Sequence, residues 1–197
     1  MSWGAWARHF NSIDMQRQIE NTVGLGISTF DHADIYGGYT TESAFGAAFS
    51  KTNISRSRIQ LISKCGIQLQ TPNRSNRLKH YNCSKNYIIS SAEASLKHLK
   101  TDYLDLLLIH RPSPLMDPHD IMEAVQYLKK EGKIINFGVS NFTPSQVELL
   151  SSEVAVAVSQ IEFSLVQHQA LFDGTLDQLI THKITPMAWA PLGTIFS

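Results

Sequence analysis

Short apolar runs alternate with segments of helical periodicity along most of the chain. The runs have the length of a β-strand, and some of them, such as residues 103–110, are apolar at nearly every position. Such a run is typical of a strand that is covered on both faces, as the strands of parallel sheets are. The pattern predicts strands at residues 26–30, 59–64, 103–110, 134–140, 156–160 and 184–189.

Capping residues mark several helix starts between these strands. We expect Ser84 to cap one helix, and Asp117 with Pro118 to start another that ends near Gly132. Residues 143–146 match a capping box that opens a short helix reaching Leu150. The expected apolar faces are Ile88, Ile89, Ala92, Leu96 and Leu99 in the first helix, Ile121, Met122, Val125 and Leu128 in the second, and Leu176, Leu179 and Ile180 in a last helix.

Repeated alternation of strand and helix indicates βαβ units and a parallel sheet. We find no linker and no repeat, so a single domain over residues 1–197 is expected. An open doubly wound sheet and a (β/α)8 barrel both fit this order. An open sheet that binds a dinucleotide carries a G-x-G-x-x-G turn after its first strand, and the chain has none. The fold class that we predict is therefore α/β, as a TIM barrel.

Composition narrows the class of protein further. Hydrophobic residues make up 43% of the chain, and 17 basic residues balance 17 acidic ones. A neutral chain lacks the field that attracts nucleic acid or an anionic membrane, and no apolar run approaches the ~20 residues of a membrane span. The first residues lack the pattern of a signal peptide, and Cys65 and Cys83 have no metal-binding spacing. We expect a cytoplasmic protein that binds no nucleic acid, membrane or metal.

Polar side chains follow the predicted strands, where the loops of a barrel gather at one mouth. The first four are Asp31, Tyr36, Lys64 and His110. Each alone has an ordinary structural explanation: Asp31 as a turn residue, Tyr36 as a packing anchor, Lys64 as a solvated strand end and His110 as the end of a strand. Together they suit protonation of an oxygen, because an ammonium beside a phenol stabilises the phenolate and a histidine can hold the oxygen. Further along, strand ends carry Ser140, Asn141, Gln160 and Trp189.

Several segments together resemble the aldo-keto reductase family, in its bacterial oxidoreductase branch. FDHADIYGGYTTE (residues 30–42) has an Asp five positions before a Tyr, as the family signature does. ISKCG and LDLLLIHRP carry the lysine and the histidine of the family in order. GVSNF, SQIEFS and MAWAPLG resemble its cofactor segments, and the likeness extends over essentially the whole chain.

The resemblance implies a barrel that binds NADP(H) and reduces a small aldehyde or ketone to an alcohol. Tyr36 would be the general acid, Lys64 and Asp31 would tune it, and His110 would orient the carbonyl. The polar loop at residues 71–84 would overhang the mouth. Residues expected at the cofactor are Ser140 and Asn141 with Gln160 at the carboxamide, Trp189 on the nicotinamide ring, and Leu192, while Trp3 or Trp6 would line the pocket or the core.

The length departs from the family pattern. The chain has 197 residues, whereas barrels of this type have ~250. By comparison with the family, its first strand is partial, and the eighth strand and last helices are missing. We expect a fragment or truncated product of an active reductase. The alternative is a truncated, non-catalytic relative or remnant that acts as a binding or regulatory protein. The oligomeric state is left open.

Overall fold

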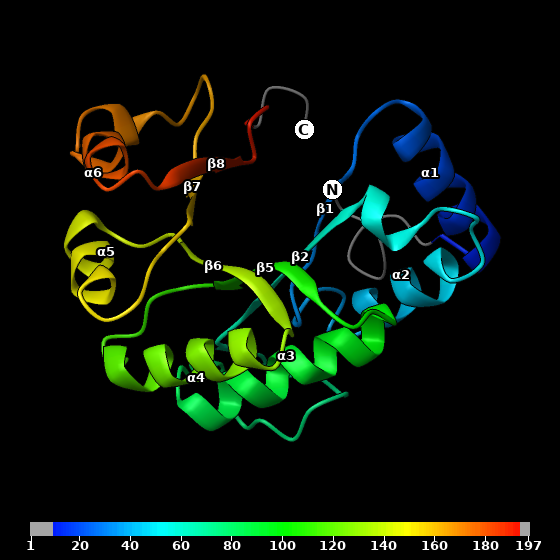
Figure 1. The fold of residues 1–197 in the computed structure, drawn as a ribbon, viewed down its shortest axis with the longest axis horizontal. Helices are drawn as coiled ribbons and strands as arrows, with labels where there is room; N and C mark the ends of the chain where they lie inside the picture. The colour runs from blue at the N-terminus through cyan, green and yellow to red at the C-terminus, as the bar shows by residue number, and fades with distance from the viewer. Residues whose placement is uncertain (1–9, 194–197) are drawn as a thin grey trace.

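The computed structural model describes residues 10–193. Within that range six strands form one parallel sheet in the order β1, β2, β5, β6, β7, β8. Figure 1 shows the sheet curving, with the helices on its outer side. The strands are β1 (Thr29–Asp31), β2 (Gln60–Cys65), β5 (Leu104–Ile109), β6 (Ile134–Ser140), β7 (Val158–Glu162) and β8 (Thr185–Trp189).

Six α-helices surround this sheet in chain order (Figure 1). They are α1 (Ser12–Gly24), α2 (Thr41–Phe49), α3 (Lys85–Leu99), α4 (Pro118–Lys130), α5 (Pro144–Ser151) and α6 (Thr175–Thr181). Two short 3₁₀ helices, η1 (Arg56–Arg58) and η2 (Gln169–Leu171), lie in the connections. A separate antiparallel hairpin pairs β3 (Ile67–Gln68) with β4 (His80–Tyr81). The described part is an incomplete (β/α)8 barrel.

Apolar side chains cover both faces of the sheet. In β5, Leu107 belongs to the large cluster that packs against the helices, whereas Leu106 and Leu108 join a small cluster with Ile62. Successive strand residues point to opposite faces, so the two clusters lie on opposite sides of the sheet. This double burial explains why residues 103–110 are apolar without alternation.

A close contact between two helices depends on a glycine. Gly46 lies in α2, and a Cβ there would overlap the backbone carbonyl of His98 in α3. Without a side chain at this position the two backbones come close enough for α2 to pack on α3. On another side of α2, the Phe45 ring packs against the Phe30 ring of β1, with centroids 5.1 Å apart.

The predicted strands and helix starts are confirmed, with shifted ends. Asp117 accepts a hydrogen bond from the backbone of His119, and Thr143 forms the expected capping box with Gln146. Ser84 occupies the cap position of α3, but its side chain makes no capping bond and donates instead to Asn82. The strand expected at residues 26–30 begins later, at Thr29, and the one expected at 156–160 becomes Val158–Glu162.

Other expectations were wrong or incomplete. The segment 71–84 is not entirely loop, since it contains β4. Met122 is half-buried rather than buried, and Ile180 is 76% exposed although its spacing fits the apolar face of α6. The sequence reading assigned neither α1 nor α2. The partial first strand, and Trp3 and Trp6, lie outside the described residues.

No helix within residues 10–193 is both long enough and apolar enough to cross a lipid bilayer.

Candidate active site

The first four candidate residues come from neighbouring positions at the carboxyl end of the sheet. Asp31 is the last residue of β1, and Lys64 lies near the end of β2. His110 follows β5 directly, and its backbone N–H donates to the carbonyl of Cys65. Tyr36 lies in the loop that follows β1. The parallel pairing of β1, β2 and β5 therefore brings these side chains to one edge.

Lys64 is the centre of this group. Its side chain is 1% exposed, and its Nζ lies 2.8 Å from Asp31 Oδ1. The same ammonium donates to the Tyr36 hydroxyl oxygen at 3.1 Å and to the backbone carbonyl of His32 at 2.9 Å. An ammonium has three protons, so these partners satisfy every donor of a fully buried cation. The charge is fixed in place and neutralised by one carboxylate.

His110 lies beside Tyr36. The two rings meet edge to face, with centroids 5.8 Å apart and planes at 78°. Burial lowers the pKa of His110 from 6.5 to about 3, and the charges of Lys64 and Arg111 act in the same direction. The imidazole is therefore neutral at physiological pH. Its Nδ1 is buried and has no hydrogen-bond partner.

A hydrogen-bonded chain links the candidate cofactor residues. Trp189 Nε1 donates to Asn141 Oδ1 at 2.8 Å, and Asn141 Nδ2 donates to Ser140 Oγ at 2.7 Å. Ser140 Oγ in turn donates to Gln160 Oε1 at 3.4 Å. Asn141 has a left-handed backbone (φ 59°) at the end of β6, which turns the chain sharply there. Leu192 lies in the turn after β8 and is 64% exposed, and it does not belong to this series of hydrogen bonds.

The two groups meet across the interior of the barrel. Gln160 Nε2 donates to Asp31 Oδ2 at 3.1 Å, although β7 and β1 are separated by three strands in the sheet. Asp31 thus uses one oxygen for Lys64 and the other for Gln160. A flat sheet could not bring these side chains together, so the contact depends on the curvature of the sheet.

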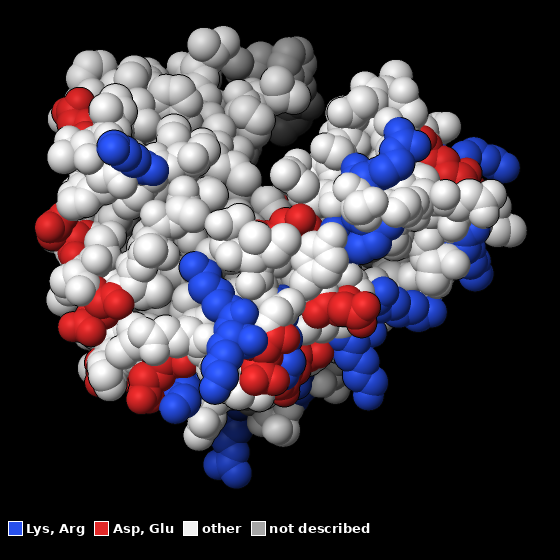
Figure 2. Space-filling view, in the orientation of Figure 1, with Lys and Arg blue, Asp and Glu red and all other residues white. Residues whose placement is uncertain are grey.

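A pocket of about 780 Å³ opens between β1 and β8. Figure 2 shows a hollow in the surface on this side of the molecule. Asp31 and Tyr36 line the pocket from one side, and Trp189 and Pro191 line it from the other. The pocket is large enough for a small organic molecule or part of a cofactor. Among residues 10–193 no group of three or more His, Cys, Asp or Glu side chains is placed to hold a metal ion.

Comparison with known proteins gives the family. The family model described as "Aldo/keto reductase family" matches residues 1–196. The chain belongs to this family.

Two curated relatives illustrate what this chain is similar to. The oxidoreductase YdhF of Escherichia coli is 48% identical over 98% of the chain and 63% of its own length. A 6-dehydroglucose reductase of Agrobacterium fabrum is 41% identical over 91% of the chain and 61% of its own length. The chain thus spans less than two thirds of these curated relatives.

A solved structure supports the fold of this chain. The structure of a glycerol dehydrogenase from Gluconobacter oxydans matches 94% of the chain and 57% of its own, with a TM-score of 0.82 and 25% sequence identity. The similarity agrees with the incomplete barrel described above.

Sequence reasoning missed three buried polar residues around the same loop. His32 has its pKa lowered to about 4 by burial, and its Nε2 has no partner. Glu42 is buried and accepts a hydrogen bond from Ser63. Asp34 accepts hydrogen bonds from Tyr87 and Ser91, and burial raises its pKa to about 7. Their position within FDHADIYGGYTTE (residues 30–42) was the available signal.

Proposed function

We propose that this chain is the greater part of an NADP(H)-dependent reductase that converts an aldehyde or ketone to an alcohol, with Tyr36 as the proton donor. The observation that carries the proposal is the position of Lys64, whose ammonium lies between the Asp31 carboxylate and the Tyr36 hydroxyl. Proton transfer from Tyr36 leaves a phenolate, and the ammonium 3.1 Å away stabilises that charge as it forms.

The neighbouring histidine fits a different role. His110 is neutral, so it is a hydrogen-bond donor and not an acid at physiological pH. A proton on its buried Nδ1 would have no acceptor, and we therefore assign the proton to Nε2. In this tautomer Nε2–H donates to the carbonyl oxygen of the substrate. The oxygen is then held beside Tyr36, whose ring contacts that of His110.

The residues present fit a nicotinamide cofactor. Amide and hydroxyl groups of Ser140, Asn141 and Gln160 match the donors and acceptors of a carboxamide, and the Trp189 indole offers a flat ring that lines the pocket. When bound, the reduced nicotinamide supplies the hydride that adds to the carbonyl carbon. The choice of NADP(H) over NAD(H) rests on the family alone.

The substrate class is a small carbonyl compound. A 6-dehydroglucose reductase and a glycerol dehydrogenase are among the similar proteins, and both names concern polyhydroxylated molecules. The pocket beside Tyr36 has space for a molecule of that size. The non-catalytic alternative gains no support from the site, because Lys64 retains a carboxylate, a phenol and a neighbouring imidazole around it.

Tyr36→Phe tests the proposal. It removes the hydroxyl and retains the ring, so we expect NADPH-dependent reduction of glyceraldehyde, used as a probe, to fall by at least ~100-fold, as for loss of a general acid. NADPH binding, followed by quenching of tryptophan fluorescence, should change little.

Tyr127→Phe is the matched control, because Tyr127 is an exposed residue of α4. Its turnover should equal that of the wild type. Turnover by Tyr36→Phe close to the wild-type rate would overturn the assignment.

A further inference from the structure

Asp34 lies in the loop between Asp31 and Tyr36, but its side chain is held by a different part of the molecule. Its carboxylate accepts a hydrogen bond from the Tyr87 hydroxyl at 2.9 Å and another from Ser91 Oγ at 3.0 Å. Both donors belong to α3, more than 50 positions along the chain, and both converge on Oδ2. The side chain is therefore a link between the loop that carries Tyr36 and a helix of the outer layer.

The backbone of the same residue is fixed to the neighbouring strand. The N–H of His32 donates to the carbonyl of Ile62 at 2.9 Å, and the N–H of Asp34 donates to that of Lys64 at 3.0 Å. These bonds continue the parallel pairing of β1 with β2 beyond Asp31. Asp34 is thus attached to β2 through its backbone and to α3 through its side chain, and the proposed proton donor follows two residues later.

After Tyr36 the loop is held by local turns: the N–H groups of Thr40 and Thr41 donate to the Tyr36 carbonyl, and Asn73 Nδ2 donates to the Gly38 carbonyl at 2.8 Å. Gly37 and Gly38 have φ angles of +62° and +65°, which glycine adopts at little cost. On the amino side of Tyr36, the attachments of Asp34 hold the loop to β2 and to α3. A shift of about 1 Å in a reacting group can cost about 100-fold in rate, so such an attachment has a measurable consequence.

Asp34 is also an expensive residue to bury. It is 8% exposed, and an ionised carboxylate loses water at a large cost unless donors replace it. An apolar residue would avoid that cost but would leave the Tyr87 and Ser91 hydroxyls without their acceptor. Asp34 makes no contact with the Asp31–Lys64–Tyr36 group through its carboxylate, and the proposed reaction does not use it.

We propose that Asp34 is a positioning residue, whose carboxylate fastens the Tyr36 loop to α3 and so fixes the Tyr36 hydroxyl beside Lys64. This inference rests on the proposed function, because the position of Tyr36 affects turnover only if Tyr36 donates the proton.

Two substitutions separate the link from the charge. Asp34→Ala removes the acceptor, and we expect kcat to fall by about 10- to 100-fold while KM for NADPH stays within about twofold. Asp34→Asn retains an oxygen that can accept from Tyr87 and Ser91, so kcat should return to within about threefold of the wild type. A merely structural role would not give this division between kcat and KM with rescue by the conservative variant.

The double variant Tyr87→Phe/Ser91→Ala tests the link from the side of α3. It removes both donors without changing the loop, and its kcat should fall in the same direction as that of Asp34→Ala. Ser90→Ala is the matched control, because the Ser90 hydroxyl is exposed and donates to the Tyr87 carbonyl rather than to Asp34. This control should retain wild-type turnover.

Hydrogen exchange gives a readout that needs neither cofactor nor turnover. Amides of residues 33–40 should exchange faster in Asp34→Ala than in the wild type, whereas Asp34→Asn should protect them. Unchanged exchange in Asp34→Ala would overturn the link between the loop and α3.

Burial of the Asp34 carboxyl should make the stability of the protein depend on pH. The titratable side chains that face Asp34 are Tyr87 of α3, Glu42 of α2, Cys65 of β2 and Tyr39 of the same loop. The pKa of Asp34 is raised to about 7, so its contribution to stability is present at low pH and is lost as the pH rises through about 7. The carboxyl of an unfolded Asp titrates near pH 3.8, so the loss runs from about pH 4 to about pH 7. Over this range the melting temperature of the wild type should fall relative to that of Asp34→Asn. Parallel curves would contradict the buried carboxyl.

The outcomes distinguish the two proposals. Wild-type kcat in Asp34→Ala, with Tyr36→Phe inactive, overturns the positioning role and leaves the proposed function intact. An active Tyr36→Phe variant overturns the proposed function itself.

Discussion

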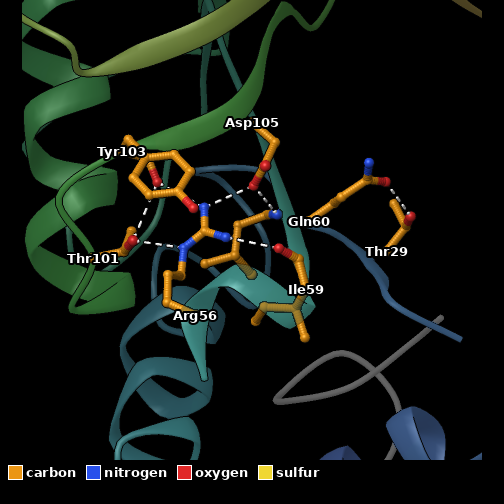
Figure 3. Close-up of polar contacts among 8 residues, drawn as sticks. Thr29, Arg56, Ile59, Gln60, Thr101, Tyr103 and Asp105 are labelled. Atoms are coloured by element: carbon orange, nitrogen blue, oxygen red, sulfur yellow. Dashed lines mark hydrogen bonds and ion pairs between the residues drawn. The ribbon is translucent and has the colours of Figure 1, made fainter. Parts of the chain in front are cut away.

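The two ends of the parallel sheet carry polar networks of opposite character. At the amino end, Arg56 donates to Thr101 Oγ1, to the carbonyls of Ile59 and Tyr103, and to Asp105 Oδ2 at 2.7 to 2.9 Å (Figure 3). Its guanidinium also stacks on the Tyr103 ring, 4.0 Å from the centroid.

The amino-end network closes on itself. Asp105 Oδ2 accepts from Arg56 and also from the backbone of Leu61, which ties η1 to β2 and β5. Arg56 and Asp105 have side chains only 19% and 21% exposed, so the ion pair is largely shielded from water. Every contact of the network is made within the protein.

The carboxyl-end network also satisfies its cation, but it borders the pocket. Asp31 and Tyr36, two partners of Lys64, both line the pocket, and His110 beside them keeps a buried nitrogen without a partner. The carboxyl-end network is neutral overall but leaves polar groups exposed at the pocket, where a substrate could bind. The amino-end network is closed, so it can contribute only to stability. In barrels the carboxyl end is the usual place for catalysis and the amino end for stability.

Lys64→Met should have the largest effect, on rate. It removes the ammonium that we propose stabilises the Tyr36 phenolate, and we expect kcat to fall by about 100- to 1,000-fold, or about 3 to 4 kcal/mol of transition-state stabilisation. Single-turnover reduction of glyceraldehyde measures this. A variant that retains more than a tenth of the rate would show that the carboxyl-end network is structural, as the amino-end network is.

Arg56→Met should affect stability and not the rate. It leaves Asp105 half-buried without its cation, and the loss of charge-assisted hydrogen bonds should cost about 2 to 3 kcal/mol of unfolding free energy. Urea unfolding measures the difference. Arg58→Met in the same short helix is the control, since Arg58 is exposed and should change stability by less than about 0.5 kcal/mol. A loss of kcat in folded Arg56→Met would contradict the assignment of the amino-end network to stability alone.

His110 should make stability depend on acid pH. Its pKa is about 3 in the folded protein and near 6.5 when unfolded, so below pH 6.5 only the unfolded state takes up a proton. Stability is therefore lost as pH falls, by about 1 kcal/mol between pH 7 and 5.5 from this group. His110→Asn should be less sensitive over that interval by this amount in urea unfolding. Equal sensitivity in both proteins would contradict a buried neutral imidazole.

Trp189→Phe should have the smallest effect. It retains an aromatic ring but removes the hydrogen bond to Asn141, so NADPH affinity should fall by less than about tenfold. A fluorescence titration measures the affinity, and Trp189→Ala should lose the quenched component as well as more affinity. Unaltered affinity in Trp189→Ala would remove Trp189 from the cofactor site.

The helices that were predicted and those that were missed differ in their surroundings. The helix α4 has a single buried stripe and a capped start, so its pattern is visible in one dimension. In α2, Thr41, Glu42, Phe45, Gly46 and Ala48 are all buried, and small residues replace part of the apolar stripe because α3 approaches closely at Gly46. The strands β3 and β4 have two residues each, which is too short for any periodicity.

The candidate site was predictable in its membership but not in its connections. Asp31 and Asp34 are both acidic and three positions apart, yet one contacts Lys64 and the other contacts Tyr87. Nothing local distinguishes them, because the difference depends on which face of an extended segment each side chain occupies and on what packs there. The pKa of Asp34 near 7 follows from that burial and not from its neighbours in the sequence.

The sequence by itself determined the order of the six sheet strands and of the helices α3 to α6, because apolar spacing and capping are local properties. Its motifs also named the candidate site residues that the structure brings together, Asp31, Tyr36, Lys64 and His110. Only the tertiary structure decided that Gln160 contacts Asp31, which is 129 positions away. That contact exists because the sheet curves and brings the ends of β1 and β7 face to face across the barrel. Curvature is a property of all the strands packed together, and no single segment encodes it.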